Sequence, residues 1–224
     1  MLNILISGCG YSFSKQERKT WVNVLQSSGI KVNDVGGPAV SNQYILNKTI
    51  VELQNNKYDF VLLQLTSIGK LDVTVNQERI AELVETDSLR NFTWNGIWPS
   101  SHSDDHVSKK LYNHWLVSPE LEVEDIFCKL LLLNKLYKNI FVLQAYDIPW
   151  RHSDDEIKSM FYNFNNPLAK QYKSSDFYKF HDHSNRNTVP CINYHANFAL
   201  EIAKHLQFPE KCIQRIANMI NKIN

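Results

Sequence analysis

Short apolar runs alternate with helix-like segments along the sequence, and this alternation restricts the fold more than any other feature. The apolar runs of strand length lie at residues 2–7, 30–35, 58–66 and 139–147. The amphipathic patterns of helical spacing lie at residues 15–28, 42–56, 122–138, 196–206 and 210–222. Strands that alternate with helices in this way form parallel sheets with helices on both faces. The sequence therefore predicts an α/β fold.

Three polar segments directly follow the first three predicted strands. They are a glycine-rich turn with Ser12, the loop 36–43 and the segment 64–69. Ligands of parallel α/β sheets bind outside the carboxyl ends of the strands, so we expect these segments to form one site. Gly29 is predicted to end the first helix and Ser41 to cap the second.

Two long stretches, near 85–120 and 150–190, interrupt the alternation. The first carries three Trp and three His, and the second is rich in Tyr, Phe, Asn and Ser. Long structured loops in a compact domain are often lids or binding walls. The length of 224 residues suits one domain. We therefore expect a single domain over 1–224, with these stretches as excursions beside the site.

Charge and cysteine usage argue against several classes of protein. The 24 basic and 23 acidic side chains give a net charge of +1, so the sequence lacks the excess of positive charge that is typical of nucleic-acid-binding proteins. The four cysteines form no CxxC pair, which favours free thiols in a reducing compartment. The sequence shows neither a signal-peptide pattern nor an apolar stretch of membrane-spanning length. We expect a cytoplasmic protein without membrane contacts.

The segment ILISGCGYSFSKQERKTW at 4–21 places Ser12 in a turn between a strand and a helix. One interpretation is that Ser12 caps the following helix. The other is that Ser12 is a nucleophile held at the end of a strand, near the positive end of a helix dipole. The turn alone does not decide between them.

This segment, the loop PAVSN at 38–42 and YDFVLLQLTS at 58–67 together resemble the SGNH (GDSL-type) hydrolases. The resemblance is closest to a phage and bacterial branch with a Gly-Cys-Ser-Phe-like nucleophile turn, and it covers roughly the first 70 residues and 193–206. It implies a three-layer α/β/α, flavodoxin-like parallel sheet with long inserted loops. Gly10-Tyr11-Ser12-Phe13 takes the place of the Gly-Asp-Ser-Leu turn, which makes Ser12 the nucleophile.

The same resemblance implies where the oxyanion and the substrate would bind. Ala39 stands where the family usually has a glycine whose N–H holds the oxyanion, and Thr66 stands where an asparagine donates. Asn42 and Gln64 lie in the same two segments and are predicted to contribute to oxyanion or substrate binding.

His195, in CINYHANFALEIAKHL at 191–206, is the predicted base. Relatives carry an aspartate two or three residues earlier, whereas this chain has Ile192 and Asn193 there. Asn193 is predicted to orient the imidazole through its amide oxygen. A dyad oriented by a backbone carbonyl, or Asp182 acting from elsewhere, stays open, as does a purely structural role for His195.

The predicted function is a serine hydrolase, an esterase, O-deacetylase or acyl transferase, that acts on a small acyl ester, with a glycan ester as one such substrate. The alternative is an SGNH-fold module that has lost catalysis and binds carbohydrate or protein. HSDDH at 102–106 and HDH at 181–183 could bind a divalent metal, but we predict no metal and no cofactor because the resembled family works without one. A nucleotide-binding domain is disfavoured because the first turn lacks the P-loop ending.

Overall fold

The computed structural model describes residues 1–9, 12, 20–37, 40–68, 71–72, 96–97, 119–150, 155–163, 165, 167–168 and 192–223. Its main sheet consists of four parallel strands: β1 (Asn3–Gly8), β2 (Lys31–Asp34), β3 (Phe60–Leu65) and β6 (Ile140–Gln144). A separate antiparallel pair joins β4 (Leu71–Asp72) to β5 (Gly96–Ile97).

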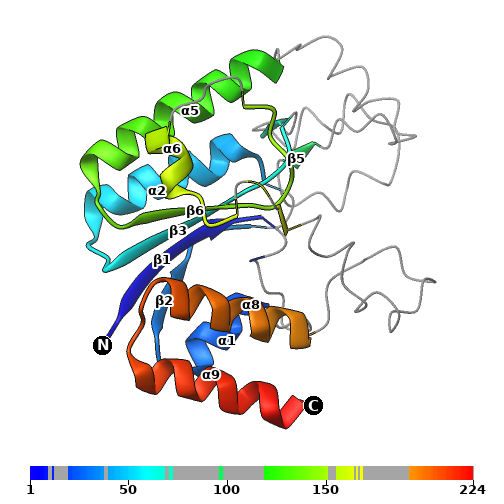
Figure 1. Ribbon diagram of the computed structural model, residues 1–224. Coiled ribbons are helices and arrows are strands. Elements are labelled where there is room, and N and C mark those ends of the chain that lie inside the picture. Colours follow the sequence, from blue (N-terminus) through cyan, green and yellow to red (C-terminus); the bar gives the residue numbers. More distant parts are fainter. Residues whose placement is uncertain are drawn as a thin grey trace, which may run out of the picture.

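Helices cover both faces of the main sheet (Figure 1). One face carries α1 (Trp21–Ser27), α8 (Ile192–His205) and α9 (Glu210–Ile223). The other face carries α2 (Asn42–Asn55), α5 (Pro119–Leu136) and α6 (Asp155–Met160). The described residues therefore form a three-layer α/β/α arrangement, as the sequence predicts.

Side chains alternate between two hydrophobic cores along each central strand. In β1, Ile4 and Ile6 join the core with α1, α8 and α9, whereas Leu5 joins the core with α2, α5 and α6. In β3, Leu62 belongs to the first core and Leu63 to the second. This alternation is the period-two pattern of a strand that is buried on both faces, and it explains why these runs are almost wholly apolar.

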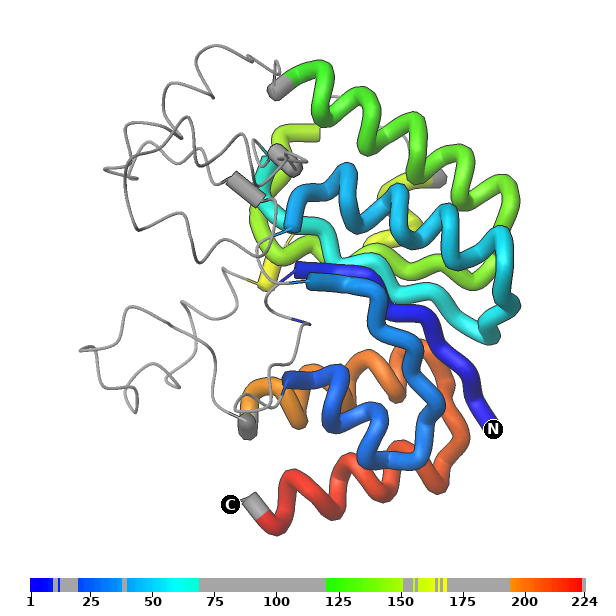
Figure 2. The backbone as a smooth tube through the Cα atoms, turned by 180° about the vertical axis from the view of Figure 1, so that it is seen from behind, coloured from blue at the N-terminus to red at the C-terminus, as the bar shows by residue number. Residues whose placement is uncertain are grey.

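The strand order β2-β1-β3-β6 places a topological switch point between β1 and β3. From β1 the chain crosses to β2 through α1 on one face, and it then passes through α2 on the other face to reach β3. The amino ends of α1, α2 and α8 all lie at the carboxyl edge of the sheet (Figure 2). A crevice at such a switch point is where α/β sheets bind ligands.

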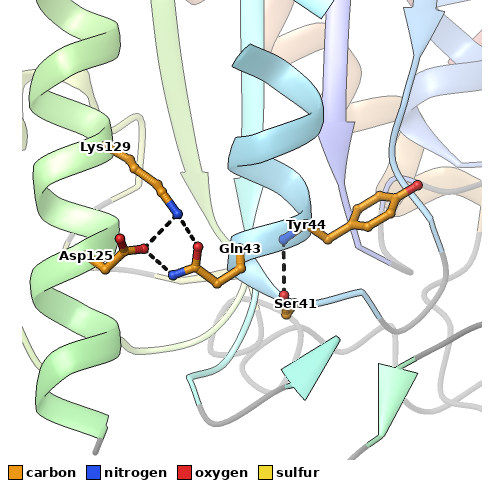
Figure 3. Close-up of polar contacts among 5 residues, drawn as sticks. All are labelled: Ser41, Gln43, Tyr44, Asp125 and Lys129. Carbon is orange, nitrogen blue, oxygen red and sulfur yellow. Dashed lines mark hydrogen bonds and ion pairs between the residues drawn. The ribbon is translucent and has the colours of Figure 1, made fainter. Parts of the chain in front are cut away.

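The beginning of α2 is fixed by its cap and by a polar contact with α5 (Figure 3). Ser41 Oγ accepts a hydrogen bond from the Tyr44 backbone N–H at 3.1 Å, which confirms the predicted cap. Gln43 donates to the Asp125 carboxylate and accepts from Lys129, and Lys129 also pairs with Asp125 at 2.9 Å. Partial burial opposes ionisation of Asp125, but these hydrogen bonds outweigh it and lower the pKa of the carboxyl.

Several predicted boundaries differ from the observed ones. The first helix begins at Trp21 with Thr20 as its N-cap, instead of at residue 15, and Gly29 follows it with φ +92°. The helix expected at 196–206 begins four residues earlier, at Ile192. Helix α6 was not predicted at all; it lies within the expected excursion 150–190. Most of that excursion and of 85–120 lies outside the described residues.

Beyond β6, Phe161 forms a parallel bridge with Val142, and the Tyr162 N–H donates to the Val142 carbonyl at 3.0 Å. This short segment lies where a fifth strand would extend the sheet. In the part of the chain that the structure describes, no helix is both long and apolar enough to cross a membrane.

Candidate active site at the carboxyl edge of the sheet

Ser12 lies in a tight turn directly after β1. Its backbone N–H and its Oγ both donate to the Cys9 carbonyl, each at 2.9 Å. Thr20 Oγ1, at the cap of α1, donates to the Ser12 carbonyl at 2.8 Å. Because Thr20 is the N-cap of α1, Ser12 does not cap that helix, which removes the simplest structural explanation for this serine.

Gly8 provides the space in which the Ser12 hydroxyl lies. A Cβ atom placed on Gly8 would lie 2.4 Å from Ser12 Oγ and 2.7 Å from Gln64 Cβ. Gly8 and Gln64 are also register partners across β1 and β3. The Ser12 hydroxyl and the Gln64 side chain therefore lie above the same glycine, on the same face of the sheet.

Gln64 is fully buried, and neither atom of its carboxamide has a hydrogen-bond partner among the described residues. Strand alternation places Gln64 on the face of Leu62, which is the face covered by α1 and α8. Burying an amide without compensation costs about 1–3 kcal/mol on the scale of protein mutational data. A buried amide without partners next to a serine hydroxyl is therefore a group to which a ligand can bind.

His195 lies in the first turn of α8 and is also fully buried, with neither ring nitrogen hydrogen-bonded to a described residue. It shares the inward face of α8 with Ala199 and Ile202, which belong to the core with Ile4 and Ile6. His195 and Gln64 thus lie on the same side of the sheet. Burial lowers the pKa of His195 to about 4, so its imidazole is neutral at pH 7.

Ser12 and His195 are not hydrogen-bonded to each other in this structure. The serine hydroxyl donates to the Cys9 carbonyl, and the imidazole has no partner in the described part of the chain. No described carboxylate contacts the imidazole either. The predicted nucleophile and the predicted base therefore share a face of the sheet without a direct hydrogen bond.

Asn42 ties the beginning of α2 to the end of β3. Its Oδ1 accepts from the Thr66 N–H at 2.8 Å, and its Nδ2 donates to the carbonyls of Thr66 at 3.1 Å and Ser67 at 3.4 Å. Both residues are fully buried. In this structure Asn42 positions Thr66, and a direct contact of either side chain with a substrate stays a prediction.

Two predicted site residues lie outside what the structure describes. Ala39 is outside the described residues, although Gly37 before it donates its N–H to the Gly8 carbonyl at 3.0 Å. Asn193 belongs to α8, but its side chain is not described, so its role as orienter stays a prediction. Asp182 and the segments HSDDH and HDH are also outside the described residues.

Some contacts at this edge had no signal in the sequence. The Cys9 carbonyl as acceptor for Ser12 and the bond from Thr20 depend on how the turn folds back on itself. Asn163 holds the end of β6 through the backbone N–H and carbonyl of Gln144, at 2.8 and 2.9 Å, and nothing in its sequence context predicts this. Among the described residues, no group of His, Cys, Asp or Glu is arranged to hold a metal ion.

Comparisons with known proteins assign no family to this chain. No family model matches the sequence, and no curated protein matches it significantly. Among solved structures, one match is a proposed lipolytic protein of the G-D-S-L family from Desulfitobacterium hafniense DCB-2. That match has 15% sequence identity and a TM-score of 0.35, and it covers 71% of this chain and 67% of the other. At these values the functional assignment has to rest on the residues of the site itself.

Proposed function

We propose that this chain is an SGNH-type serine hydrolase that cleaves or transfers a small acyl group, with Ser12 as nucleophile and His195 as base. The observation that carries the proposal is the position of Ser12. A serine hydroxyl that does not cap the adjacent helix lies at the switch point of a parallel sheet, next to a buried amide and on the same face as a neutral histidine.

The proposed reaction begins when the Ser12 hydroxyl turns away from the Cys9 carbonyl. Oγ then attacks the ester carbonyl carbon, its proton passes to His195, and the carbonyl electron pair moves onto oxygen. When the tetrahedral intermediate collapses, the alcohol leaves with the proton from His195. Water, or a second hydroxyl in an acyl transfer, then gives a proton to His195 and attacks the acyl carbon. The bond to Ser12 Oγ breaks, the acid or the new ester leaves, and Oγ takes the proton back from His195.

Esters of small acyl groups are the substrates to test first. Ser12, Gln64 and His195 are all fully buried, so a bulky acyl chain would have to displace them. None of the three carries a formal charge at pH 7, because the pKa of His195 is lowered to about 4. An O-acetyl group on a sugar combines a small neutral acyl group with a polar alcohol, and we propose it as the first substrate.

The test is labelling with a fluorophosphonate probe, which reacts with activated serines. We expect the native chain to be labelled at Ser12 and the variant Ser12→Ala to lose labelling completely. Ser28 provides a matched control, because it is also fully buried and its Oγ donates to the carbonyl three residues earlier, Leu25, at 2.7 Å. Ser28→Ala should therefore label like the native chain.

A second candidate function is a binding module without catalysis. It is favoured by the bond from Ser12 Oγ to Cys9 and by the lack of a hydrogen-bond partner for His195 among the described residues. If the native chain resists the probe and releases no acetate from acetylated sugars, but binds such sugars in calorimetry, this alternative is correct and the hydrolase proposal is wrong.

A further inference from the structure

Polar atoms that are buried without a partner are concentrated on the α1/α8 side of the sheet. Within the described part of the chain seven such atoms occur, and five belong to Gln64, His195 and Trp21. All three side chains are fully buried, and Trp21 and the helix of His195 belong to the same core. Buried polar groups normally find partners, so this concentration indicates a place where a ligand supplies them.

Gln64 is the member of this group that lies beside the proposed nucleophile. Its Cβ and Ser12 Oγ would each lie within 2.7 Å of a Cβ atom added to Gly8. Because neither end of the carboxamide has a partner in the described residues, the group can rotate to present its N–H to an atom bound at Ser12.

Two described backbone donors at this site are already in use. The Ser12 N–H is bonded to the Cys9 carbonyl, and the Thr66 N–H is bonded to Asn42 Oδ1. Gln64 Oε1 lies 3.3 Å from the Cβ atom added to Gly8, so a half-turn of the carboxamide brings Nε2 to that position. The described residues provide no acceptor for this buried donor.

We infer that Gln64 is a catalytic residue whose Nε2–H donates to the oxyanion that forms when Ser12 attacks an ester. This inference rests on the proposed hydrolase function and adds to it a side-chain donor from the end of β3. As the bond between Oγ and the acyl carbon forms, the carbonyl electron pair moves onto oxygen, and the proton of Ser12 passes to His195. The negative oxygen is the acceptor that the buried amide lacks.

The experiment compares the rate of fluorophosphonate labelling in the native chain and in Gln64→Met. Ser12 Oγ attacks phosphorus, fluoride leaves and the proton passes to His195, while the phosphoryl oxygen takes the position of the oxyanion. Methionine is of similar length but has no N–H, so we expect labelling to be 10²–10³-fold slower, the usual effect of removing one oxyanion donor.

Thermal unfolding of the same variant separates catalysis from structure. Replacing an amide without partners by an apolar side chain removes a buried polar group, so the midpoint of Gln64→Met should rise, by roughly 2–4 °C for a chain of this size. A structural glutamine would show the opposite change. Gln64→Leu also has no N–H donor, and it should also label at least about 10²-fold more slowly.

Gln144 at the end of β6 is the matched control. It is also buried, but its Oε1 accepts from Trp150 Nε1 at 3.0 Å. Gln144→Met should therefore lower the thermal midpoint and leave the labelling rate unchanged.

The labelling experiment distinguishes a failure of the role of Gln64 from a failure of the hydrolase proposal. If the native chain labels at Ser12 and both Gln64 variants label as fast as it does, the role of Gln64 is wrong and the hydrolase proposal stands. If the native chain neither labels nor hydrolyses an ester, the hydrolase proposal is wrong, and the inference about Gln64 is overturned with it. If Gln64→Met labels slowly and has a raised thermal midpoint, the hydrolase proposal and the role of Gln64 are both supported.

Discussion

Burial strongly constrains the protonation of the His195 side chain. Burial lowers the pKa of His195 from its ordinary value of 6.5 to about 4. Above pH 6.5 the imidazole is neutral in both the folded and the unfolded chain, so it contributes no pH dependence. Between pH 6.5 and 4 the unfolded chain binds a proton that the folded chain does not, and the free energy of unfolding falls as the pH falls.

The resulting prediction concerns His195→Gln. In the native chain the lowered pKa of His195 should make the free energy of unfolding fall by about 3 kcal/mol from pH 7 to pH 4. This value follows from the size of the pKa shift, since one pKa unit corresponds to about 1.4 kcal/mol. Urea titrations across this range should show that His195→Gln loses that part of the pH dependence. His205→Gln, on the exposed face of the same helix, should keep it. Equal pH dependence in His195→Gln and the native chain would contradict the burial of a neutral imidazole.

Both residues that carry the proposed chemistry were predicted from the sequence, but their surroundings were not. Ser12 and His195 follow from the order of motifs. Their hydrogen bonds depend on side-chain rotation and on burial by segments far apart in the chain, which local patterns do not encode. The position of His195 inside α8, and not before it, was also not predicted.

Two asparagines hold the carboxyl ends of neighbouring strands in the same manner. Asn42 binds the backbone N–H and carbonyl of Thr66 after β3, and Asn163 binds those of Gln144 in β6. Each replaces the hydrogen bonds that a further strand residue would make, and each is buried. The two asparagines differ in where they act relative to Gln64. Asn42 holds Thr66, which is two residues from Gln64, whereas Asn163 holds Gln144, which belongs to the neighbouring strand β6.

This pair allows a matched comparison of Asn42→Ala and Asn163→Ala. Each substitution removes buried hydrogen bonds to a backbone N–H and a backbone carbonyl, so each should lower the free energy of unfolding by about 1–3 kcal/mol. Only Asn42→Ala should also slow the labelling of Ser12, because it releases the end of the strand that carries Gln64. Denaturant titration and labelling kinetics on both variants check this. Equal labelling rates in the two variants would mean that the end of β3 needs no support for catalysis.

The prediction of secondary structure succeeded where apolar periodicity was strong and failed where it was weak. Strand β3 was predicted at 58–66 and found at Phe60–Leu65, because a run of apolar residues interrupted only by Gln64 permits few other structures. Helix α6 has only six residues and no repeated apolar face in the sequence, so its stability comes from packing against β6 and α5. The start of α8 was placed too late because a buried histidine interrupts its apolar pattern.

The whole molecule depends on contacts between the two ends of the chain. The core on the α1 face combines β1 and α1 with α8 and α9, and Arg215 in α9 donates to the Ser28 carbonyl at 3.1 Å. The core on the other face is built from α2, α5 and α6. Alternation predicted the layers, but it did not predict which helices share a face. For α1, α2 and α5, which connect strands of the main sheet, that assignment follows from right-handed crossovers and the reversal of strand order at β1.

Because β1 is buried between the two cores, we expect the two layers to unfold as one unit. Ile202 in α8 and Leu130 in α5 are both almost inaccessible to solvent, one in each core. Ile202→Ala and Leu130→Ala should each lower the free energy of unfolding by about 2–5 kcal/mol. Hydrogen exchange of the Leu5 and Ile6 amides should be measured under conditions where exchange reports on global opening. In both variants the exchange should accelerate, and the free energy of opening should fall by the same amount as the free energy of unfolding. If only Ile202→Ala accelerates this exchange, the α2/α5 layer opens independently, and the end of β3 would then be held from one side alone.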